Sequence, residues 1–62
     1  MPSRIMKLEA FAIYYIEDAG YTAEDVDGCM LVRAASVVSD LTEDELAQAV
    51  RDYSAKHAKD RK

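Results

Sequence analysis

The stretch AGYTAEDVDG, residues 19–28, gathers the side chains most able to do chemistry. It combines a threonine that can cap a helix with three acids and two glycines. A segment of this kind can be a calcium loop, the turn of a DNA-reading motif, or only the joint between two helices. The choice among these three decides which functions the sequence can indicate.

A calcium loop of the EF-hand type needs acids at its first and twelfth positions. With Gly28 at the sixth position, Asp25 and Asp27 match the third and fifth. The first position is then Ala23 and the twelfth is Ala34, so both essential ligands are missing. The acids are better explained as helix-capping residues, and we expect no metal site.

A helix-turn-helix motif also requires a helix, a turn that contains glycine, and a second helix. The second helix would begin AEDVDG and the third TEDELAQ, so each would bring acids toward DNA phosphates. The net charge of −4 likewise disfavours nucleic acid as a general partner. An alternative remains in which phosphates are contacted by basic residues near the C-terminus, namely Arg51, Lys56, Lys59, Arg61 and Lys62, or by Arg4 and Lys7 across a dimer.

Nucleophilic catalysis would require an activated side chain, and Cys29 with His57 is the one pair to consider. Acidic neighbours raise the pKa of a thiol, which disfavours Cys29 as a nucleophile. A 62-residue chain also has little volume for an enclosed pocket. We therefore expect no enzyme, no cofactor and no small-molecule substrate.

One cysteine allows no internal disulfide. Together with the lack of an apolar run of about 20 residues, this suggests a cytoplasmic protein rather than a membrane protein.

Half of the residues are hydrophobic and breakers are few, which predicts an all-α fold of one domain over residues 1–62. We expect a small three-helix bundle that is completed by dimerisation or by a partner protein. The helices are expected at about residues 4–18, 23–39 and 43–58, with a basic tail at about 56–62 that can fray. Ser3 is the expected cap of the first helix and Gly20 its left-handed stop. Thr42 and Glu45 form a capping box at the third.

The apolar spacing predicts which face of each helix is buried. In the first helix this face is Ile5, Leu8, Phe11, Ala12, Tyr15 and Ile16; in the second it is Val26, Met30, Ala34, Val37 and Val38, with Leu31 beside them; in the third it is Leu46, Ala49, Val50 and Tyr53, followed by His57. Leu41 is expected to pack on Leu46.

Gly28 falls within the second helix, where glycine costs about 1 kcal/mol relative to alanine. Two explanations are open. Gly28 can separate a short first turn from the main helix, with Asp27 as a second cap, or it can allow the backbone of another helix to approach closely.

Two charges lie inside predicted apolar faces, Glu9 in the first helix and Arg33 in the second. An unpaired buried charge is costly, whereas a paired one is tolerated. The two residues are therefore expected to form a buried charge pair, within one chain or across a dimer. The alternative is that both side chains reach solvent at the rim of the core.

The first helix carries more apolar and aromatic surface than one bundle needs. Its predicted partner or dimer interface comprises Met6, Phe11, Ile13, Tyr14 and Tyr15. The alternative is that the first helix is simply the central helix of the bundle. An acidic surface suited to a basic partner is formed by Glu17, Asp18, Glu24, Asp25, Asp27, Asp40, Glu43, Asp44 and Glu45. The alternative is that these acids form a solvated face. The sequence is thus interpreted as a small protein–protein interaction module, an adaptor, antagonist or regulator, whose partner is another protein or a second copy of itself. The nucleic-acid-associated regulator is the alternative.

Overall fold

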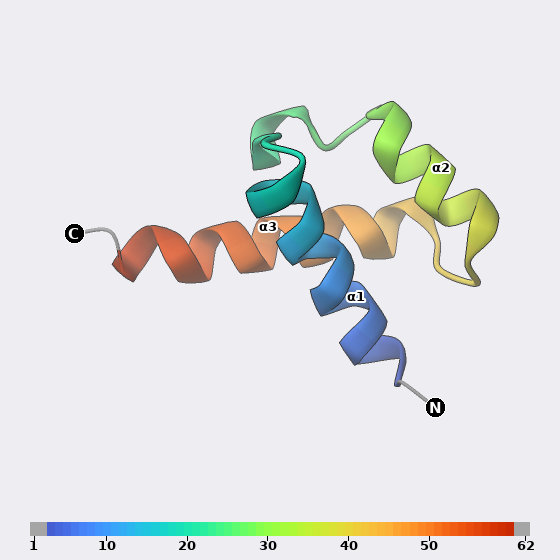
Figure 1. The fold of residues 1–62 in the computed structure, drawn as a ribbon, viewed down its shortest axis with the longest axis horizontal. Coiled ribbons are helices and arrows are strands. Elements are labelled where there is room, and N and C mark those ends of the chain that lie inside the picture. Colours follow the sequence, from blue (N-terminus) through green and yellow to red (C-terminus); the bar gives the residue numbers. More distant parts are fainter. Residues whose placement is uncertain (1–2, 61–62) are drawn as a thin grey trace.

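The computed structural model describes residues 3–60, with the side chains of residues 3–57, and within that range it contains three α-helices and no strand (Figure 1). The elements are α1 (Arg4–Ile13), the π-helical turn η1 (Tyr14–Asp18), the 3-10 turn η2 (Ala23–Asp25), α2 (Met30–Val38) and α3 (Glu43–Asp60). The prediction of a small all-α fold with three helices is confirmed.

The first helical segment begins and ends through short-range contacts. The Ser3 Oγ accepts a hydrogen bond from the Met6 amide at 3.2 Å, which is the expected N-terminal cap. After α1 the chain widens into η1, where the Ala19 amide donates to the Tyr14 carbonyl at 2.8 Å. Gly20 follows with φ +78°, the left-handed conformation that ends a helix. Together α1 and η1 span the residues 4–18 that were expected to be helical.

The segment expected as one helix over residues 23–39 is broken in two at Gly28. Gly28 has φ +76°, which cannot continue a right-handed helix, and α2 begins only at Met30. The cap of α2 is Cys29 rather than Asp27. A Cβ added at Gly28 would meet nothing within 4 Å, so the idea that another helix approaches its backbone is wrong. Gly28 is needed for its backbone conformation.

The core lies where α1 and α2 pack against α3, which contacts both of the other helices (Figure 1). The fully buried residues come from every helix and from the loops: Ala12, Tyr15, Val26, Val32, Leu41, Leu46, Ala47 and Val50. Leu41 and Leu46 share this cluster, as expected, and Ala49 and Tyr53 pack against it. In α1 the predicted face is correct except for Ile5, whose side chain is 69% exposed.

The predicted inward face of the second helix is wrong for four of its members in α2, and correct there only for Leu31, which packs against the core. Met30, Val37 and Val38 are 76, 78 and 85% exposed, and Ala34 is exposed as well. The inward side is formed instead by Leu31, Val32 and Ala35. The break at Gly28 explains the error: Val26 is buried from a separate turn, so its position does not fix the rotation of α2.

We predict that Gly28→Ala lowers the free energy of unfolding by about 1–2 kcal/mol, because a non-glycine residue is strained in the left-handed region. Inside a continuous helix the same change would raise stability by about 1 kcal/mol. Urea denaturation therefore tests the break by the sign of the effect. Gly28→Asn is the matched control and should lose less, since asparagine tolerates this conformation better. A Gly28→Ala variant that is more stable than the wild type would contradict the conclusion that the helical segment is broken at Gly28.

Candidate functional site

A groove of about 630 Å³ lies between α1 and α3. One wall is the outer side of α1, formed by Ile5, Leu8, Glu9, Ala12 and Ile13. The other wall is α3, formed by Glu45, Gln48, Ala49, Asp52, Tyr53, Lys56 and His57. Leu8, Ala12, Ala49 and Tyr53 belong to the core or pack against it, so they give the groove an apolar floor fixed by the fold.

The rim of the groove on α3 is polar and ordered by side-chain contacts. The Gln48 amide donates to Asp52 at 2.9 Å, and the rings of Tyr53 and His57 lie 4.1 Å apart between centroids. The Tyr53 hydroxyl donates to the carboxylate of Glu17, and this hydrogen bond raises the pKa of Tyr53. Glu17 belongs to η1, so the bond also ties the end of the first helical segment to α3.

The opposite end of the groove is held by Arg4 and Glu45. The guanidinium of Arg4 donates to both carboxylate oxygens of Glu45, at 2.6 Å for the Nε contact, and lies 3.4 Å from the Asp40 carbonyl. The same carboxylate accepts the Thr42 amide at 3.0 Å, while the Thr42 hydroxyl accepts the Glu45 amide at 3.1 Å. The predicted capping box is therefore present. The hydrogen bonds from Arg4, and then from Thr42, lower the pKa of Glu45 to about 2.

The predicted interface residues are divided by the structure into three groups. Ile13 lines the groove, whereas Met6 and Tyr14 are exposed and do not line it. Phe11 is half-buried, and its ring lies 5.8 Å from that of Tyr15. The prediction is wrong for Tyr15, which is fully buried and donates its hydroxyl to the Thr22 carbonyl at 2.9 Å. Burial raises the pKa of Tyr15 to about 12.

A buried Glu9–Arg33 pair within one chain is wrong. Both residues are exposed, and no charged residue is buried in the described part of the chain. The ion pairs that form among residues 3–57 are Arg4–Glu45 and Arg51–Asp27, the latter at 2.7 Å. Each of the two expected charges lies on an apolar surface, but on one that faces outward. Pairing across two copies stays a prediction.

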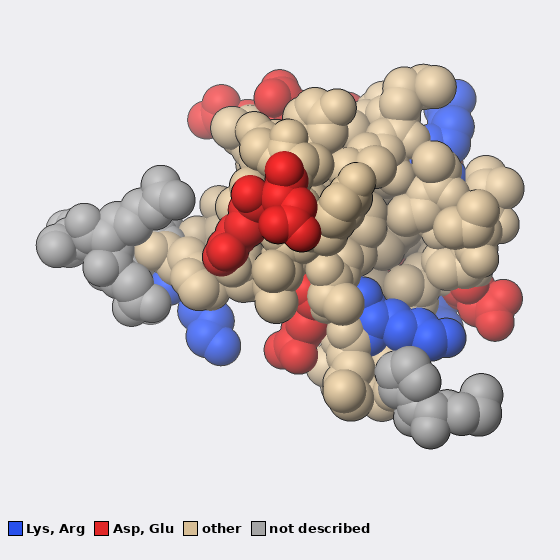
Figure 2. All heavy atoms as spheres, viewed as in Figure 1, with Lys and Arg blue, Asp and Glu red and all other residues tan. Residues whose placement is uncertain are grey.

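On the face drawn in Figure 2, acidic residues lie in separate groups that are divided by tan residues rather than in one continuous surface. The nine acids expected to form one surface differ in burial. Eight are exposed and Glu45 is half-buried. Several are engaged within the chain: Glu17 by Tyr53, Asp27 by Arg51 and Glu45 by Arg4. The use of this acidic surface by a basic partner stays a prediction.

The structure does not bring Cys29 and His57 together in one site. Cys29 packs against the core, whereas His57 lines the groove. Among the described side chains, no three His, Cys, Asp or Glu residues are grouped so that they could hold a metal ion. None of the described helices combines the length and apolar character needed to cross a membrane.

The basic residues proposed for phosphate contacts are only partly described. Arg51 donates to both oxygens of Asp27, at 2.7 and 2.8 Å, and Arg4 is held by Glu45. Lys56 lines the groove and Lys7 is exposed on α1. The side chains of Lys59, Arg61 and Lys62 lie outside the described residues. Phosphate binding by these cations stays a prediction.

Sequence reasoning missed two parts of the surface: the α3 wall of the groove, and the outward face of α2 with Met30, Val37 and Val38. Both apolar patterns were assigned to the core. The α3 pattern held no signal of this exposure. The α2 pattern held one, the charge of Arg33 beside Val37.

No protein-family model matches this chain, and no match was found among curated proteins or among solved structures.

We predict that Glu45 contributes stability that is lost in acid. Its pKa is lower in the folded chain than in the unfolded chain, so the contribution is full above about pH 4.3 and disappears as the pH falls toward about 2. Thermal melts of the wild type and of Glu45→Gln should differ at pH 6 and converge toward pH 2. Glu43→Gln, in the same turn, is the control and should follow the wild type. A difference that stays constant with pH would contradict the prediction.

Proposed function

We propose that this chain is a protein-interaction module that binds an amphipathic helix of a partner in the groove between α1 and α3. The observation that carries the proposal is the groove itself, whose apolar floor is open to solvent along two helices. Binding of a helix in such a groove is a common mode of peptide recognition. The bound helix would cover Ile5 and Ile13, which the isolated chain leaves 69 and 44% exposed.

The charges around the groove define the chemistry of the partner. Glu9 on α1 and Asp52 on α3 face solvent from opposite walls. A helix with an apolar face and a Lys or Arg beside it would bury its apolar residues between the walls and keep its cation near these acids. Attraction between exposed charges adds little affinity but selects the partner and its orientation.

The proposed role is binding rather than catalysis. The groove is open along its length, and Tyr53 and Gln48 are already engaged with Glu17 and Asp52. The proposal places the module in the cytoplasm, where its single thiol, Cys29, stays reduced.

The test is a titration of the labelled protein with a synthetic amphipathic peptide of about 14 residues, or four helical turns, with a leucine face and flanking lysines. We expect saturable shifts of the Ala12, Ala49 and Tyr53 amide resonances. Ile5→Lys should weaken binding about tenfold or more, because loss of one buried isoleucine costs about 1.5–3 kcal/mol.

Met6→Lys is the matched control. Met6 is 60% exposed on the same turn of α1 but does not line the groove, so its variant should bind within about twofold of the wild type. Circular dichroism should show both variants folded. Equal losses in the two variants, or no saturable binding by the wild type, would contradict the proposed function.

A further inference from the structure

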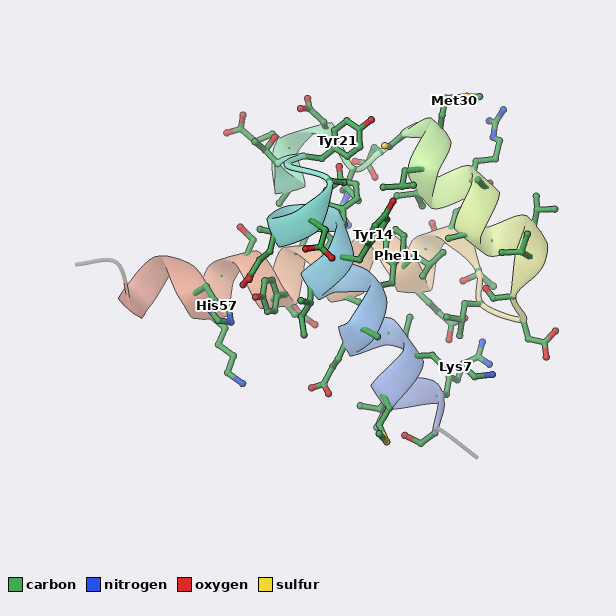
Figure 3. All side chains as sticks on the ribbon, in the orientation of Figure 1. Lys7, Phe11, Tyr14, Tyr21, Met30 and His57 are labelled. Carbon is green, nitrogen blue, oxygen red and sulfur yellow. The ribbon has the colours of Figure 1, made fainter. Side chains whose placement is uncertain are left out.

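The outward side of α2 is a second apolar surface, distinct from the groove. Met30, Ala34 and Val37 recur at intervals of three and four residues, with Val38 beside them, and all four face solvent. In Figure 3 Met30 lies at the outer edge of α2 and points away from α1 and α3. Figure 2 shows the surface in this region as largely tan. A helix face of this kind is what the groove is suited to bind.

We infer that the occupant of the groove is α2 of a second copy of this chain. The inference rests on the proposed function, namely that the groove binds a helix, and adds the identity of that helix. The two surfaces agree in size. α2 contains nine residues, Met30–Val38, and the α1 wall of the groove also spans nine, from Ile5 to Ile13. Each is about 13 Å long at the helical rise of about 1.5 Å per residue.

The charges of the two surfaces are complementary. Arg33 is the only charged residue in α2, and it lies on the exposed side of the helix. The groove is lined by three acids, Glu9, Glu45 and Asp52, and by one cation, Lys56. Glu45 is engaged by Arg4, which leaves Glu9 and Asp52 as the acids open to a partner. Neither Arg33 nor Glu9 has a hydrogen bond or ion pair with another described side chain, so both are available to a second copy. Docking of α2 would place Arg33 against these acids and join the two charges that lie within apolar stripes.

The positions of the two surfaces favour one type of assembly. Met30 on α2 and His57 in the groove lie at opposite sides of the molecule in Figure 3. One copy therefore offers α2 to the next copy and receives α2 from another. Such a head-to-tail contact builds an open chain or a closed ring rather than a two-fold dimer. The contact is small beside the roughly 1,000 Å² of a stable interface, so association is expected to be weak, with a Kd of about 10 μM or more.

The test is sedimentation of the full chain from about 10 μM to 1 mM, a range that brackets weak association. The mass of the wild type should rise with concentration from the monomer value of 6.9 kDa past the dimer. Val37→Lys removes the donor surface and Ile5→Lys removes the acceptor surface, so each variant alone should stay a monomer. An equimolar mixture should form a one-to-one dimer and no larger species. The reason is that Ile5→Lys keeps an intact α2 surface and Val37→Lys keeps an intact groove, so only one contact can form between them.

Charge reversal gives an independent test of orientation. Arg33→Glu and Glu9→Arg should each weaken association by about two- to fivefold, as expected for an exposed ion pair. The double variant should return to the wild-type value. Glu24→Arg is the matched control for Glu9→Arg: Glu24 is exposed in η2 and does not line the groove, so this variant should associate like the wild type.

Two results would overturn the inference. A mixture of Val37→Lys and Ile5→Lys that stays monomeric would mean that α2 of one copy does not bind the groove of another. Any self-association of the wild type would then join two α2 surfaces or two grooves. A wild type that stays at 6.9 kDa throughout would mean that α2 is not the occupant. In either case, saturable peptide binding that is sensitive to Ile5→Lys would leave the proposed function standing, whereas loss of that binding as well would remove both.

Discussion

The carboxylate of Glu45 joins the start of α1 to the start of α3, two helices whose packing forms the core. One oxygen accepts the Thr42 amide and so begins α3, while both oxygens accept from Arg4, the first residue of α1. The first turns of two helices that are far apart in the sequence are thereby joined at one group. The pair is half exposed, and such pairs contribute only modestly to stability. Its importance is geometric, because it holds one end of the groove whose walls these helices form.

The second constraint is the left-handed backbone at Gly28. Because it breaks the helical segment, the buried position of Val26 does not determine which side of α2 faces the core. Val26 is fixed in the core by η2, and Asp27 is tied to α3 through Arg51. α2 then starts afresh at Met30 and buries Leu31, Val32 and Ala35. This rotation leaves Met30, Val37 and Val38 in solvent. A chain of 62 residues has too small a core to bury both sides of a nine-residue helix.

The features that could be predicted from the sequence are those determined within one turn of chain. The Ser3 cap, the left-handed Gly20 and the Thr42–Glu45 box each involve residues at most three positions apart, so their residue types suffice to identify them. The groove and the rotation of α2 could not be predicted in this way. They depend on how helices cross and on long-range contacts such as that of Tyr53 with Glu17. Helical spacing indicates that a face is apolar, but it does not indicate whether the same molecule covers it.

The charge within an apolar stripe carries that missing information. Burying Glu9 or Arg33 without a partner would cost several kcal/mol, which is comparable to the whole stability of so small a domain. The fold avoids this cost differently in the two helices: α2 turns the stripe of Arg33 outward, whereas α1 keeps Leu8 and Ala12 in the core and leaves Glu9 exposed in the groove wall. The apolar residues beside them then remain in water, and their burial is left to an intermolecular contact. A single charge thus has two effects on an apolar stripe. It keeps the stripe hydrated in the isolated chain, and it allows the stripe to bind a surface of opposite charge. That Glu9 and Arg33 have opposite signs, on faces of equal length, is the reason to regard the two surfaces as partners of each other.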